Sequence, residues 1–137
     1  MALIYHIASA ADWEQARRDG EYTTSTRGVS LAEQGFIHAS TAPQVAPVAN
    51  AFYGDDQGLV VLVIDAGRLG PEVRCEPVPG WDDPFPHIYG PLNVDAVVTT
   101  LPLGRDASGR FTFAPSAAAR SEEARIRPPR RRAGRRT

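Results

Sequence analysis

The sequence has little cysteine and no long apolar run, and both features limit what the chain can be. Cys75 is the single cysteine, which excludes an internal disulfide and a cysteine-based zinc site. The longest apolar run, Leu59 to Ile64, is far shorter than the roughly 18 residues of a membrane-spanning helix. The N-terminus lacks the basic start and long apolar run of a secretion signal. We therefore expect a cytoplasmic protein, with no membrane partner, that is stabilised by packing alone.

Charge is divided unevenly along the chain, although the formal net charge is only −1. Lysine is absent, so all 15 basic residues are arginine. Residues 1–115 carry a net charge of −7 and residues 116–137 a net charge of +6. The second segment has one large aliphatic side chain, Ile126, and too little apolar surface to offset the entropy of ordering. We expect one domain over residues 1–115 and a disordered, arginine-rich tail over residues 116–137.

The arginine-rich tail leaves three interpretations open. It could neutralise the phosphates of a nucleic acid, with an affinity that falls as salt rises. It could also fold back on the acidic domain, or it could remain a solvated extension. No aromatic residue lies among its arginines to stack on bases, which favours the solvated extension.

Local patterns predict an α+β domain. The segment Ser9–Gly20 combines a capping serine, arginines in the last turn and a terminal glycine, which together predict a helix. Similar patterns predict a helical turn at Ser30–Gln34 and a helix from Thr41 toward Gly54, shortened or kinked by Pro47. The β-branched run Leu59–Asp65 predicts a central strand covered on both faces. Further strands are expected over residues 3–7, 36–40, 73–78, 94–101 and 110–113.

The segment Pro77–Pro91 is rich in proline and aromatic residues. It holds five prolines and two glycines, together with Trp81, Phe85, His87 and Tyr89. Such a composition resists regular structure, so we expect an ordered loop with a short extended piece at residues 87–89. Aromatic rings in a stiff loop predict the wall of a binding site.

Three histidines, His6, His38 and His87, lie in short apolar or aromatic contexts. A buried histidine usually makes two hydrogen bonds, and its neutral form can hold a sugar hydroxyl or move a proton. Core packing and a shared cleft both remain open for these residues. Their spacing matches no local metal-ligand pattern, so we expect no metal site.

Glu76 lies on the same face of its predicted strand as Arg74. The two side chains could form an exposed ion pair of little energetic value. Alternatively, Glu76 could hold ribose hydroxyls or stabilise developing positive charge at a cleft edge. Cys75 next to it could be a thiol nucleophile, but a lone cysteine in a strand is more often an inert core residue.

Two sequence blocks carry a family resemblance. They are Gly-Phe-Ile-His-Ala-Ser at residues 35–40 and Pro-His-Ile-Tyr-Gly-Pro-Leu at residues 86–92. With the segment around His6, the strand Leu59–Asp65 and Glu76, they resemble the bacterial family called domain of unknown function 952, over residues 3 to about 103. Members of this family look like the ADP-ribosyltransferase fold. The resemblance implies a split, mainly antiparallel β-core with flanking helices and a cleft for NAD or a related nucleotide.

The resemblance also implies roles for individual residues. The implied catalytic residues are Glu76, His38 and His87, and the implied cofactor-binding residues are His6, Ser40, Gln44 and Tyr89. In that fold the residue matching His6 holds the ribose next to nicotinamide, and an aromatic ring such as Tyr89 packs on the nicotinamide. Cleavage of the nicotinamide–ribose bond develops an oxocarbenium-like cation, which a carboxylate such as Glu76 would stabilise.

The chain departs from two members of that fold group. Arg74 stands where arginine-directed transferases have the first residue of Glu-x-Glu or Gln-x-Glu, so arginine modification is not expected. RNA 2′-phosphotransferases use histidine with arginines; His38 and Gln44 fit, but the arginines are not recognisable. We expect an enzyme that transfers or hydrolyses the ADP-ribose of NAD. The alternatives are a non-catalytic sensor of a nucleotide-like small molecule and a nucleic-acid adaptor that binds through the tail.

Overall fold

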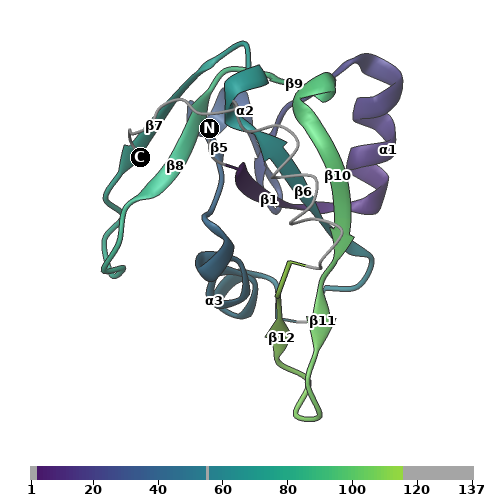
Figure 1. Cartoon of the computed structure of the whole chain (residues 1–137), viewed down its shortest axis with the longest axis vertical. Helices are drawn as coiled ribbons and strands as arrows, with labels where there is room; N and C mark the ends of the chain where they lie inside the picture. Colours follow the sequence, from purple (N-terminus) through teal and green to yellow (C-terminus); the bar gives the residue numbers. More distant parts are fainter. Residues whose placement is uncertain (1–2, 55, 116–137) are drawn as a thin grey trace, which may run out of the picture.

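The first sheet of the domain has its central strand where the sequence predicts it. In a computed structural model, which describes residues 3–54 and 56–115, β6 (Leu59–Asp65) lies between β1 (Leu3–Ser9) and β10 (Val97–Pro102) (Figure 1). Both neighbours pair antiparallel to β6. Alternate residues of β6 pack into two different hydrophobic cores. Val61 and Val63 belong to one core, and Leu62 and Ile64 belong to the other; all four are fully buried. Both faces of β6 are therefore covered, which explains its unbroken apolar sequence.

The second sheet carries the residues of the candidate site. Its order is β5 (Ile37–His38), β8 (Phe85–Tyr89), β7 (Glu72–Glu76), again antiparallel. It meets the first sheet at one backbone pair, where Tyr5 and Ser40 each donate an N–H to the carbonyl of the other at 2.8 and 2.7 Å. The structure confirms an α+β domain with mainly antiparallel sheets.

Two of the three helices begin and end as their capping residues predict. Ser9 caps α1 (Ala10–Asp19), which ends at Gly20 in the left-handed region with φ of 88°. A capping box at Ser30 starts α2 (Leu31–Gln34). The third helix, α3 (Ala42–Phe52), continues through Pro47 to Phe52, so this proline does not shorten it.

Short elements complete the described residues. Paired two- or three-residue strands are β2 (Glu21–Tyr22) with β9 (Leu92–Asn93), β3 (Thr24–Thr26) with β4 (Val29–Ser30), and β11 (Gly104–Arg105) with β12 (Phe111–Thr112). The 3-10 turns are η1 (Ala66–Arg68) and η2 (Val94–Ala96). The turn η2 occupies the start of the strand predicted at residues 94–101, so β10 begins only at Val97. Within the described part, no helix is long and apolar enough to cross a bilayer.

The extended piece predicted at residues 87–89, within the loop Pro77–Pro91, is confirmed but was predicted too short. Residues 85–89 form β8, the central strand of the second sheet, and the irregular loop before it covers residues 77–84. Pro86 lies one residue beyond the last β5–β8 register pair, His38 with His87, and takes part in backbone bonding through its carbonyl, which accepts from the Ala39 N–H at 3.0 Å. The predicted tail, residues 116–137, and its proposed binding of nucleic acid lie outside the described residues.

Asn50 provides a test of how α3 is attached to β12. Its side-chain oxygen accepts from the backbone N–H of Phe111 at 2.8 Å, and its amide donates to the Phe111 carbonyl at 3.1 Å. We expect Asn50→Ala to lower the free energy of unfolding by about 2 kcal/mol, because two hydrogen bonds to a partly buried backbone are lost. Urea denaturation measures this value. The control Gln15→Ala, at an exposed position, should change the free energy of unfolding by less than about 0.5 kcal/mol. An equally small effect of Asn50→Ala would mean that its hydrogen bonds to Phe111 do not stabilise the attachment of α3 to β12.

Candidate functional site

A cavity of about 210 Å³ lies where the second sheet, α3 and the loop 77–84 approach one another. We call it the aromatic cavity, because most of the side chains that line it carry aromatic rings. Its lining residues are Thr26, Gln34, Phe36, His38, Val48, Phe52, Tyr53, Val78, Trp81 and His87. The loop 77–84 contributes Trp81 and Val78, which confirms that this segment forms a wall over a cavity.

Strand pairing brings two of the histidines together. His38 on β5 is the register partner of His87 on β8, so their rings project from the same face of the sheet. The ring centroids are 5.5 Å apart. Phe36 stacks on the His87 ring at 3.9 Å with an interplanar angle of 17°, and Phe85 contacts His38 at 4.8 Å. The two imidazoles are thus held between aromatic neighbours in a fixed orientation.

Glu76 and His87 form a carboxylate–imidazole pair at the edge of this cavity. Oε1 of Glu76 accepts a hydrogen bond from Nδ1 of His87 at 2.7 Å and a short one from the Tyr89 hydroxyl. Because an ionised carboxylate only accepts, Nδ1 of His87 carries a proton, and Nε2 is the ring nitrogen left for other partners. His87 is 4% exposed, and its Nε2 is buried without a partner among the described residues. An orphaned buried nitrogen in a cavity lining points to a ligand.

The charge states of the neighbours follow from their surroundings. Hydrogen bonds from Tyr89 and His87 lower the pKa of Glu76, which is therefore ionised at neutral pH. Burial, with smaller contributions from His6 and His87, lowers the pKa of His38 to about 4. The ionised Glu76 carboxylate therefore accepts a hydrogen bond from His87 but does not line the cavity. His38 lines the cavity with a neutral ring.

His6 is placed behind the cavity rather than in its lining. It is 2% exposed; Nδ1 donates to the His38 carbonyl at 2.6 Å, and Nε2 accepts from the Tyr22 hydroxyl at 3.0 Å. Burial lowers the pKa of His6 to about 4, so its ring is neutral. His6 supports the backbone of His38, and a direct contact with ribose stays a prediction.

Ser40, Gln44 and Tyr89 are also absent from the cavity lining. Ser40 is buried, and its backbone joins the two sheets. Gln44 accepts from the Thr41 N–H at 2.9 Å and donates to the Pro84 carbonyl at 3.0 Å, so it fixes the start of α3 and the end of the loop 77–84. Tyr89 contacts Phe36 and holds Glu76. Their contacts with a ligand stay predictions.

Arg74 and Glu76 share one face of β7, as predicted, but their ion-pair partners differ. Arg74 pairs with Glu72 at 3.2 Å on the exposed surface, whereas Glu76 turns toward His87. Cys75 is exposed on this edge strand, so the expectation that it packs in the core is wrong. The physical reason is that β7 has a neighbour on one side only, and its alternate residues at this end face solvent.

Several cavity residues were not predicted from the sequence. Phe36 lies inside a recognised block, yet its packing on His87 depends on strand pairing that the sequence does not display. Val48 and Phe52 are four positions apart on α3, a spacing that predicts one face of a helix but not what that face covers. Phe52 is 57% exposed at the cavity and lies 6.4 Å from the ring of Trp81. The contact between Phe52 and Trp81 joins α3 to the loop 77–84, and no local pattern in the sequence predicts it.

The structure defines this chain as an α+β domain that has an aromatic cavity and a carboxylate–imidazole pair. The chain belongs to the family described as protein of unknown function (DUF952), whose model matches residues 7–100. This confirms the family predicted from the two sequence blocks.

Solved structures agree with the family membership. The chain is similar to protein CC0527 from Caulobacter crescentus in its X-ray crystal structure, with 35% identity, a TM-score of 0.70, and coverage of 81% of this chain and 94% of that chain. Similarity to the solution NMR structure of CC0527 gives 36% identity, a TM-score of 0.65, and coverage of 80% and 91%. No match is found among curated proteins. The likeness to the ADP-ribosyltransferase fold stays a prediction.

Proposed function

We propose that this chain binds NAD or a related nucleotide, with the nicotinamide ring in the aromatic cavity, and transfers or hydrolyses its ADP-ribose. The observation that supports this most directly is the unpartnered Nε2 of buried His87, which Glu76 orients and which lines a cavity with aromatic walls. A base that is held by a carboxylate and belongs to a residue lining a ring-sized space is suited to proton transfer next to a planar group.

The size of the cavity limits which part of the ligand it encloses. Its volume of about 210 Å³ is below the range of about 300 to 1,000 Å³ found for pockets that enclose drug-sized ligands. A single planar ring with a small substituent fits this description, and the remainder of a dinucleotide would stay outside. Phe36 and Trp81 offer ring faces and edges for packing, and Gln34 offers an amide for a polar substituent.

The proposed reaction assigns a proton acceptor to the cavity. A water molecule, or the hydroxyl of an acceptor, attacks C1′ of the ribose and gives its proton to Nε2 of His87. The C1′–N bond breaks, and its electron pair leaves with nicotinamide, which departs as a neutral molecule. Glu76 stabilises the imidazolium so formed, as the carboxylate does in other carboxylate–histidine pairs. In this scheme Glu76 is a positioning residue that acts through His87.

A second candidate function is binding of the same nucleotide without cleavage. Glu76 does not line the aromatic cavity, and no other carboxylate does so among the described residues. A cation that develops on the ribose would lack direct stabilisation by a negative charge inside the cavity. This observation supports a nucleotide sensor as the second candidate.

Tryptophan fluorescence and nicotinamide release separate the two candidates. The chain has two tryptophans, and only Trp81 lines the cavity, whereas Trp13 packs against a different core. In the Trp13→Phe variant of the full chain, we expect NAD to quench Trp81 emission saturably and to yield free nicotinamide on chromatography. Saturable quenching without release would favour the sensor. The absence of any saturable change would contradict both candidates.

A further inference from the structure

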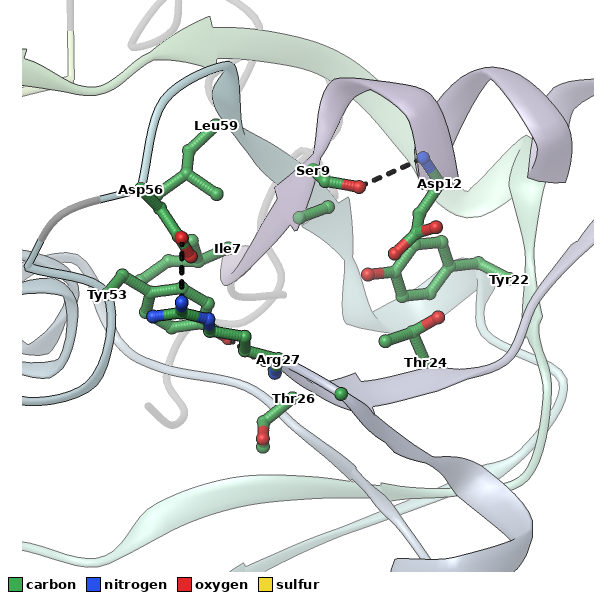
Figure 2. Close-up of a pocket in the computed structure, with 12 residues that line it drawn as sticks. Ile7, Ser9, Asp12, Tyr22, Thr24, Thr26, Arg27, Tyr53, Asp56 and Leu59 are labelled. Carbon is green, nitrogen blue, oxygen red and sulfur yellow. Dashed lines mark hydrogen bonds and ion pairs between the residues drawn. The ribbon is translucent and has the colours of Figure 1, made fainter.

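A second, smaller cavity of about 100 Å³ opens where β1 joins α1 (Figure 2). Figure 2 shows Asp12 and Tyr22 on one side of it and Arg27, Tyr53 and Asp56 on the other. We call it the polar cavity, because eight of the twelve residues around it have polar or charged side chains.

At the polar cavity, the carboxylate of Asp12, in the first turn of α1, is exposed and can accept hydrogen bonds. Arg27 is paired with Asp56 at 3.3 Å, and the Arg27 backbone N–H donates to the Tyr53 hydroxyl at 3.2 Å. Within the described part of the chain, no cation pairs with the carboxylate of Asp12, whose charge helps burial to raise the pKa of Tyr22. Two carboxylates and one guanidinium leave a net negative charge, which suits a ligand that brings O–H donors and disfavours an anion.

The two cavities are neighbours. Thr26 and Tyr53 line both of them. A buried hydrogen-bond chain also joins them, because the Tyr22 hydroxyl at the polar cavity donates to His6, and His6 donates to the carbonyl of His38 at the aromatic cavity. The position of Tyr22 is therefore fixed relative to the wall that holds the ring of the proposed ligand.

We propose that the polar cavity is a sugar subsite, which binds vicinal hydroxyls of the same ligand whose planar ring enters the aromatic cavity. This inference rests on the proposed function. The Asp12 carboxylate accepts hydrogen bonds from a pair of neighbouring hydroxyls, and Thr26 and Tyr53 contact the ligand where ring and sugar join. His6 was predicted to hold the ribose. In this proposal it does not contact the sugar but orients Tyr22, whose hydroxyl donates to it.

The test compares a charged ring with the same ring joined to a sugar. Isothermal titration calorimetry measures the binding of 1-methylnicotinamide and of nicotinamide riboside, which carry the same pyridinium charge, to the full chain and to its Asp12→Asn variant. We expect Asp12→Asn to weaken riboside binding about tenfold, since charge-assisted hydrogen bonds are lost, and to change 1-methylnicotinamide binding less than about twofold. Glu14→Gln is the matched control, because it removes the same charge from the exposed surface of the same helix and should change neither affinity.

Each other outcome has a separate meaning. If the riboside binds the wild-type chain and Asp12→Asn does not weaken it, the sugar subsite is wrong while the proposed function stands. If Asp12→Asn weakens 1-methylnicotinamide and the riboside equally, the residue acts through its charge or on the fold, and the subsite is overturned. If neither compound binds the wild-type chain, the proposed function and the sugar subsite both fail.

Discussion

Replacing His87 by glutamine is expected to lower nicotinamide release by about 100- to 10,000-fold, the usual contribution of a positioned general base. Glutamine can still donate a hydrogen bond toward Glu76, but its amide cannot accept a proton from an attacking water. Chromatographic assay of nicotinamide with saturating NAD measures the change in kcat. Thermal melting of the variant should show a folded protein, because the hydrogen-bond donor to the carboxylate is kept.

The variant Glu76→Gln tests whether the carboxylate acts through the imidazole. We expect a smaller loss, about 10- to 100-fold, because the base is still present but its protonated form is no longer stabilised. The loss should fall on kcat, and the KM for NAD should change little, because the imidazolium forms only as the proton is transferred. A merely structural role for Glu76 would instead lower the melting temperature and raise KM. Full release of nicotinamide in both variants would refute the proposed proton transfer.

Local sequence features predicted the elements of the fold because the interactions that form them are local. The cap at Ser9, the capping box at Ser30 and the left-handed glycine at Gly20 each act within one helical turn. The strand Leu59–Asp65 was recognisable because burial on both faces leaves an unbroken apolar run. Pro86 was misleading because its effect depends on where β5 ends, which is a property of the paired strands and not of the segment.

The candidate site was predicted in its chemistry but only partly in its geometry. His38 and His87 meet because β5 and β8 pair in one register, and residues 49 positions apart display no such register in the sequence. His6 could not be separated from them, because an alternating strand looks the same whether its second face covers a cavity or a core. In the structure that face joins the core with Ile4 and Ala8, and the aromatic cavity lies beyond His38.

The buried position of His6 leads to a second large effect, on stability as a function of pH. The pKa of His6 is about 4 in the folded chain and about 6.5 in the unfolded chain. Between these values the unfolded chain binds a proton that the folded chain does not, so stability is complete above pH 6.5 and is lost as pH falls toward 4. We expect His6 alone to lower the free energy of unfolding by about 2 kcal/mol between pH 7 and pH 5.

Urea denaturation of His6→Phe at the two pH values isolates this contribution. At pH 7 the variant should be less stable than wild type by about 2 kcal/mol, because the His38 carbonyl and the Tyr22 hydroxyl lose their partner. At pH 5 the difference should almost vanish, since only the wild type has lost the stabilisation by neutral His6. The control Leu62→Ala, at the register partner of His6, should cost about 2 to 5 kcal/mol at both pH values. His38 is present in all three proteins, so its titration cancels in the comparison. If His6→Phe lowers the free energy of unfolding equally at pH 7 and pH 5, burial does not keep His6 neutral.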